Sequence, residues 1–321
     1  MPALLDLPRE LRDKILSLVI DNPAPAPVDA LAKSDRTELH DVKYNGWYGG
    51  DGVKYSVLES RTDIQPILLV NHQLHAESLA ALDLLPTKYC YSLDIMIVDE
   101  CELWPTWLLV PALTTRVDKV YAAFRSSGIS KGHHIGFSGG CGGPPMITWC
   151  FYSILERFLR VGAKGLQEKE HDELVSIKLL EVDVRTPDVA PDMLAPKDIY
   201  RVDKLHRLRK ESGIDYLMHP EFIVNFIASE IKTLLVMGYH TAAFGGIVFE
   251  RIGTIRLMLD GEVREEWDLA KLFSSIRFND SFGHIQPRER RPEMFKKWKA
   301  RAYKTRIELG LPVIPLEEGI D

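Results

Sequence analysis

The sequence has no run of about eighteen apolar residues, the minimum for a helix that crosses a bilayer. Its beginning also lacks the uncharged apolar block of a secretory signal peptide. Charged side chains interrupt that region instead, namely Asp6, Arg9, Glu10 and Arg12. We therefore expect neither secretion nor a membrane partner.

Cysteine is scarce and is not arranged in pairs. The chain of 321 residues holds four cysteines, with no C-x-x-C spacing among them: Cys90, Cys101, Cys141 and Cys150. Stabilising disulfides belong to oxidising compartments, and small secreted domains use them densely. The pattern predicts free thiols in a reducing compartment, which would be the cytoplasm or the nucleus.

Familiar metal and phosphate motifs are missing as well. The candidate zinc ligands are His133, His134, Cys141 and Cys150, but their spacing matches no familiar zinc module. The chain contains no H-E-x-x-H, and Gly245-Gly246 lacks the Lys-Ser/Thr partner of a phosphate-binding loop. We expect no metal site and no cofactor.

One catalytic pattern does occur, at Gly136-Phe137-Ser138-Gly139-Gly140, which matches G-x-S-x-G. A nucleophile elbow needs an apolar strand before this pattern and a helix directly after it. The residues upstream do not read as a strand, and Gly142-Gly143-Pro144-Pro145 delays the next helix. A serine hydrolase that uses Ser138 with His133, His134 or His284 is one alternative, but the sequence favours a protein that is not an enzyme.

What the sequence does contain is a clear amphipathic helix from Leu4 to Ile20. Pro8 suits the first turn of a helix, and Glu10 suits its positive end. The apolar residues recur at helical spacing and form one stripe, which consists of Leu7, Leu11, Ile15, Leu18 and Val19. Arg9, Arg12, Asp13 and Ser17 are expected to face elsewhere.

A second helix is predicted from Ile67 to Leu85, started by Pro66 and stopped by Pro86. Its apolar face would contain Val70, Leu74, Ala81 and Leu85. It also carries a polar signature, L-x-x-N-x-Q-x-x-x-E, formed by Asn71, Gln73 and Glu77. We expect these three polar residues to pin the helix to its neighbours.

The pattern Leu-Pro-x-Glu-Leu-x-x-x-Ile-Leu-x-x-Val in the first helix resembles the opening of an F-box, a helical module that docks substrate receptors onto cullin-type ubiquitin ligases. Together with the long loop and the second signature, it resembles the F-box-like proteins of filamentous fungi. This resemblance implies that Leu7, Pro8, Leu11, Ile15 and Leu18 bind the linker subunit of the ligase. A compact F-box has no counterpart of the inserted residues 21–66, which are predicted to form a long exposed connection.

Beyond Pro86 the pattern changes to strands that alternate with helices. Strands are predicted at 89–98, 117–124, 174–184 and 252–259, and helices at 147–161, 198–211, 221–237, 263–275 and 292–309. The stretch 104–111, which holds two tryptophans between prolines, is predicted to be a turn or short helical piece. The fold class is therefore mixed α/β, with parallel strands in an irregular, degenerate leucine-rich-repeat-like array.

Charge is distributed unevenly along the chain. The net charge is −6, but residues 287–306 hold nine Lys and Arg against two Glu. Phe295, Trp298 and Ala302 fall on one face of the predicted last helix, so we expect this helix to dock on an acidic body. A phosphate-contacting helix, a nuclear-import signal and an anionic membrane surface stay open as alternatives. An acidic body argues against a nucleic-acid partner.

These observations predict three regions: an F-box-like helical region over 1–86, an α/β body over 87–286, and a basic helix and tail over 287–321. The favoured function is a protein-interaction module that receives the substrate of a cullin-type ubiquitin ligase and binds an unknown target protein. The first alternative is an F-box-like scaffold that acts outside any ligase. The second is the serine hydrolase described above.

Overall fold

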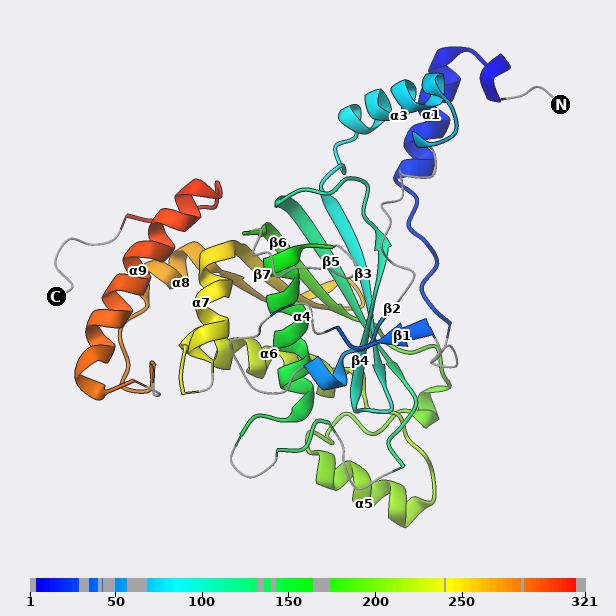
Figure 1. Cartoon of the computed structure of the whole chain (residues 1–321). Coiled ribbons are helices and arrows are strands. Elements are labelled where there is room, and N and C mark those ends of the chain that lie inside the picture. Colours follow the sequence, from blue (N-terminus) through cyan, green and yellow to red (C-terminus); the bar gives the residue numbers. More distant parts are fainter. Residues whose placement is uncertain are drawn as a thin grey trace.

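The structure is a computed structural model that describes residues 4–28, 35–39, 42, 50–56, 68–131, 136–139, 143–163, 174–239, 241–283 and 286–315. Its centre is a six-stranded mixed sheet with the strand order β4-β3-β5-β6-β7-β8 (Figure 1). The strands are β3 (Cys90–Val98), β4 (Glu102–Leu109), β5 (Arg116–Ser127), β6 (Ser176–Val184), β7 (Ile252–Leu259) and β8 (Glu262–Asp268). The predicted mixed α/β class is confirmed.

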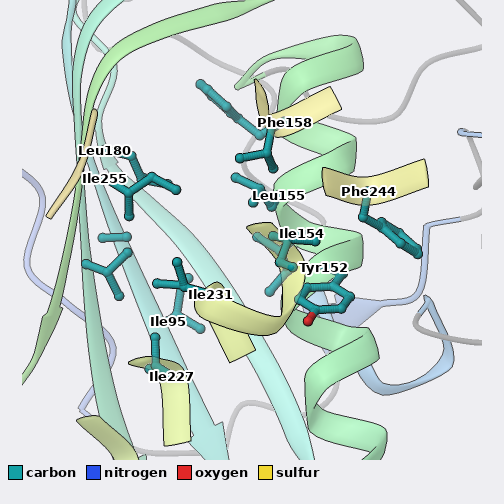
Figure 2. Packing of buried hydrophobic residues seen from close by; sticks show 14 of the residues in the cluster. Ile95, Tyr152, Ile154, Leu155, Phe158, Leu180, Ile227, Ile231, Phe244 and Ile255 are labelled. Carbon is teal, nitrogen blue, oxygen red and sulfur yellow. The ribbon is translucent and has the colours of Figure 1, made fainter. Parts of the chain in front are cut away.

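The four inner strands run parallel, and each edge strand is joined to its neighbour by an antiparallel hairpin. Parallel strands require crossover connections, and these contain helices α4 (Met146–Val161), α6 (Pro220–Val236) and α7 (Ala242–Arg251). Figure 2 shows Leu155 and Phe158 of α4 packed towards Leu180 and Ile255 of the sheet. The main core therefore lies between one sheet face and these helices.

The remaining helices of the body complete this layer. Helix α5 (Val202–Ser212) lies at the end of the sheet where β6 finishes, and α8 (Leu269–Ser275) follows β8. Helix α9 (Arg291–Glu308) packs on α7, where Trp298 contacts Phe249, and its Phe295, Trp298 and Ala302 are all buried. The docking face predicted for the basic helix is thereby confirmed. Short 3-10 turns occur at Pro191–Met193 and Arg288–Arg290.

A pair of helices stands apart from the sheet. Helix α1 (Arg9–Ile20), preceded by a 3-10 turn at Leu4–Asp6, packs beside α3 (His72–Leu84), and the pair projects from the end of the molecule where β3 begins (Figure 1). A small apolar cluster separate from the main core joins them, made of Leu16, Ile20, Leu74, Ala81 and Leu82. In the described chain, no helix combines the length and apolarity that a membrane crossing requires.

The inserted residues 21–66 were predicted to form a long exposed connection. Their described parts lie against the body instead. Strand β1 (Arg36–Thr37) pairs with β2 (Tyr55–Ser56), after a 3-10 turn at Gly50–Gly52. Val53 is buried and bridges to Leu103 at the outer edge of β4. This contact covers the backbone groups of an edge strand that would otherwise be open to other chains.

Two predicted helical pieces are strands instead. The stretch 104–111 lies largely in β4, where Pro105 is tolerated because β4 is an edge strand. Residues 263–268 belong to β8, and only 269–275 are helical. Asp260 and Gly261 both adopt positive φ angles, which produce the tight hairpin turn that returns the chain beside β7.

Several helix boundaries also differ from the predictions, and one helix was missed. Helix α1 begins at Arg9 rather than Leu4, and α5 spans Val202–Ser212 rather than 198–211. Helix α3 begins at His72 rather than Ile67, because Asn71 caps it. Helix α6 ends with Met237, not Gly238, in the left-handed conformation, and the buried Met237 side chain offsets that strain. Helix α7 was not predicted at all, because Gly245-Gly246 lowers its helix propensity.

We predict that Gly245→Ala destabilises the protein by about 1–3 kcal/mol, although alanine is the better helix former. A Cβ atom at Gly245 would collide with the Leu234 carbonyl oxygen and approach Met237 Cγ to 2.8 Å. The measurement is the free energy of unfolding from a urea titration. Gly238→Ala is the matched control, since its Cβ would meet no atom within 4 Å. Equal stability of the two variants would contradict the packing argument.

Candidate functional site: the α1–α3 helix pair

The start of α1 is set by Pro8, which occupies the cap position, and its carbonyl accepts hydrogen bonds from the N–H groups of Leu11 and Arg12. Glu10 lies in the first turn, where its charge suits the positive helix end. The start of α3 is set by Asn71, whose side-chain oxygen accepts a hydrogen bond from the Leu74 N–H. In both helices a residue of the sequence motif, Pro8 or Asn71, therefore occupies the cap position.

A buried ion pair joins the two helices. Arg12 donates from Nε to Glu77 Oε2 at 2.8 Å and from Nη2 to Glu77 Oε1 at 2.5 Å, which is a two-pronged contact. Gln73 donates to the same carboxylate at 3.0 Å, and Arg12 also donates to the Leu7 carbonyl. Arg12 and Glu77 are 65 positions apart in the sequence, so this polar network joins the two sequence signatures.

Asn71 was expected to pin the helix to a neighbour, but its side chain caps α3 itself. The network confirms the pinning role for Glu77, which joins α3 to α1, and Gln73 contributes through the same carboxylate. The network also has an electrostatic consequence, because the hydrogen bonds from Arg12, followed by that from Gln73, lower the pKa of Glu77 to about 2. The carboxylate is therefore ionised throughout the physiological pH range.

The ion pair corrects the prediction for Arg12. This residue was expected to face away from the packed side of the helix, but it lies on the buried face together with Leu16 and Ile20. Leu16 and Ile20 were not predicted to be on the packed face, because the apolar stripe on the neighbouring face has the more regular helical spacing. Leu16 and Ile20 follow Arg12 by four and eight residues and therefore lie on the same helix face. This spacing would have identified them if Arg12 had been recognised as the partner of Glu77.

Because the buried face is Arg12, Leu16 and Ile20, much of the predicted partner-binding stripe points outward. Leu11 is 50% exposed and Leu18 is 65% exposed, and Pro8 is exposed as well. Leu7 and Ile15 are half-buried at the border with the packed face. Val19, beside Leu18, is 50% exposed. The helix pair therefore presents an apolar surface that its own chain leaves in contact with solvent.

One hydrogen bond links the ends of the helix pair, and a second links the segment after α1 to the sheet. After α1, Asp21 accepts a hydrogen bond from the Thr87 hydroxyl at 2.7 Å, which links the ends of α1 and α3. The proline-rich segment that follows runs along the outer edge of β4, where the Ala24 N–H donates to the Leu108 carbonyl at 2.7 Å.

The structure around Ser138 does not resemble the nucleophile elbow of a serine hydrolase. Strand β5 ends at Ser127 and α4 begins at Met146, so Ser138 lies in the connection between them, eleven residues after the strand and eight before the helix, rather than in a tight nucleophile elbow. Ser138 is exposed, and all its suggested partners, His133, His134 and His284, lie outside the described residues.

For metals, the described residues contain no group of three or more His, Cys, Asp or Glu side chains placed to hold an ion. His133, His134 and Cys141 lie outside that part of the chain. Cys150 is fully buried in α4, where burial raises the pKa of its thiol to about 12. It packs as a small apolar residue, as predicted.

A scan against models of known protein families found no match, and searches of curated proteins and of solved structures found none either. What the site does is therefore inferred from its own residues.

We predict that acid loosens the helix pair through Glu77. Its pKa is about 2 in the folded protein against an ordinary value of 4.5, so the ionised carboxylate stabilises the fold above pH 4.5. That contribution declines as the pH falls from 4.5 toward 2. Hydrogen exchange of α1 amides, corrected for intrinsic rates, should show a larger loss of protection over this range in the wild type than in Glu77→Gln. An equal loss in both proteins would contradict the prediction.

Proposed function

We propose that the protein is a non-enzymatic interaction module, in which α1 binds the linker subunit of a cullin-type ubiquitin ligase and the α/β body holds a target protein. One observation carries the proposal, which is the exposure of Leu11 and Leu18 on a helix that the rest of the fold holds outward. A helix with apolar anchors on one face suits a groove on a partner protein.

The architecture gives further support. Among the described residues, the cluster between α1 and α3 has five buried members, with Leu4, Leu68, Leu85 and Ala112 packed against it, and a surface helix normally buries its whole apolar face. Burial of the outer stripe against another protein would complete that packing. In this proposal the pair is F-box-like, the body is a degenerate leucine-rich-repeat-like array, and the protein works in the cytoplasm or nucleus.

A scaffold that acts outside any ligase would use the same surface for a different partner. The protein that α1 binds distinguishes the two functions. Capture of the linker subunit together with cullin supports the ligase receptor, and capture of neither by the folded protein contradicts it.

We predict that Leu18→Asp abolishes co-purification of the linker subunit and cullin, because a charge in the centre of an apolar contact would have to be buried without a partner. The same change should alter the free energy of unfolding by less than about 1 kcal/mol, since Leu18 is exposed in the free protein. Affinity purification followed by mass spectrometry measures the first effect, and urea titration the second.

The matched control is Leu113→Asp, because Leu113 is also an exposed leucine (46%) but lies in the connection before β5. It should leave capture intact. Loss of capture in both variants, or in neither, would contradict the assignment of the contact to α1.

A further inference from the structure

A basic surface lies where the end of α8 meets the middle of α9, and the contacts proposed above do not use it (Figure 1). Residues 269–279 contain two Lys or Arg and no Asp or Glu, and residues 294–307 contain six Lys or Arg and no Asp or Glu. Both stretches lie wholly in the described part of the chain. Positive charge is therefore concentrated in these two neighbouring segments.

Acidic residues at the borders neutralise only part of this charge. Asp268, which caps α8, and Asp280 bound the first stretch. Three carboxylates form ion pairs with α9, namely Glu293 with Lys297, Glu250 with Arg301 and Glu308 with Lys304. Eight basic residues thus stand against five acidic ones, an excess of three positive charges. The described ion pairs include neither Arg277 nor Lys299, so the excess lies on the side of α9 that faces α8.

Arg277 and Lys299 are neighbours in space. Lys299 Nζ donates to two carbonyl oxygens at the end of α8, and the nearer is that of Ile276, at 2.8 Å. The rings of Phe278 and Phe295 pack with their centroids 6.0 Å apart. Arg277 comes between Ile276 and Phe278 in the chain, so its backbone is held beside the turn of α9 that contains Phe295 and Lys299.

This proximity has an electrostatic consequence. Burial, followed by the charge of Arg277, lowers the pKa of Lys299. Arg277 is exposed and, within the described chain, has no hydrogen-bond or ion-pair partner. Lys299 uses two of its three N–H groups on α8. Lys296, one turn earlier on α9, is exposed and adds a third positive charge on the same side. The surface therefore offers positive charge and free N–H donors together.

The size of this surface distinguishes between anionic partners. Lys296 and Lys299 are one helical turn apart, about 5 Å along the axis, with Arg277 beside them. Outside residues 287–306 the chain carries a net charge of −13. A nucleic acid or a bilayer would extend beyond the basic surface, and its negative charge would meet this acidic remainder. A short acidic peptide segment would cover the basic surface alone.

We propose that Arg277, Lys296 and Lys299 bind an acidic segment of the target protein. That the segment belongs to a target rests on the proposed function, whereas the binding of an acidic peptide does not. A carboxylate between Arg277 and Lys299 would relieve their mutual repulsion and accept charge-assisted hydrogen bonds from their free N–H groups. Because Arg277 and Lys296 are exposed, the contact would be sensitive to salt.

The test is fluorescence anisotropy with a labelled peptide that contains four consecutive glutamates, added to the full chain at low salt. We expect saturable binding that weakens as salt increases, and no binding of the matching glutamine peptide. Arg277→Gln should weaken binding about fivefold, the effect of one exposed ion pair. This variant should fold, since Arg277 is exposed and makes no hydrogen bond within the described chain.

The matched control is Arg207→Gln. Arg207 is also an exposed arginine with no carboxylate partner in the described chain, but it lies on α5. It removes the same charge and should leave peptide binding unchanged. Absence of saturable binding to the wild type, or an equal effect of the two substitutions, would overturn the proposal. Tighter binding of a DNA duplex or of vesicles that contain phosphatidylserine would overturn it as well, in favour of a nucleic-acid or membrane contact.

The outcome is independent of the ligase assignment. Arg277→Gln should still capture the linker subunit through α1, and Leu18→Asp should still bind the acidic peptide. Peptide binding without linker capture would leave the acidic-segment site standing and remove the ligase, and the reverse result would do the opposite.

Discussion

The ion pair between Arg12 and Glu77 decides which side of α1 faces its own protein. A buried ion pair adds little net stability, since the gain is offset by the loss of hydration, but its two-pronged geometry requires Arg12 to face α3. With Arg12 turned inward, Leu11 and Leu18 are turned outward. A neutral, purely apolar contact could slide or rotate, and the same leucines could then pack inside.

A second constraint comes from the order of the parallel strands. β3, β5, β6 and β7 are added to the sheet in one direction, and crossovers of one hand then place their helices on a single face. Among the described residues, the other face receives no crossover helix. It can therefore carry a charged network, and its buried Asp94 and Asp183 keep two arginines in place.

Much of the fold could be predicted from the sequence, because long periodic segments such as 147–161 and 252–259 have one dominant interpretation. The errors occurred where tertiary context overrides local preference. In the sequence alone, Pro105 indicates a break, but it pairs with β3 in an edge strand. Gly245 indicates a loop, but it lies in a helix that packs closely against α6. The division into three regions stays a prediction.

The helix-pair site shows the same limit. Periodicity identified the stripe that contains Leu11 and Leu18, but it could not reveal that Arg12 is buried, because its partner Glu77 lies across a long insertion.

The most direct test of the central claim is hydrogen–deuterium exchange of the full chain with and without a purified cullin linker subunit. The account predicts that the linker protects the amides of α1, while exchange in β5 and β6 is unchanged. Unchanged exchange throughout α1 in the presence of excess linker would contradict it.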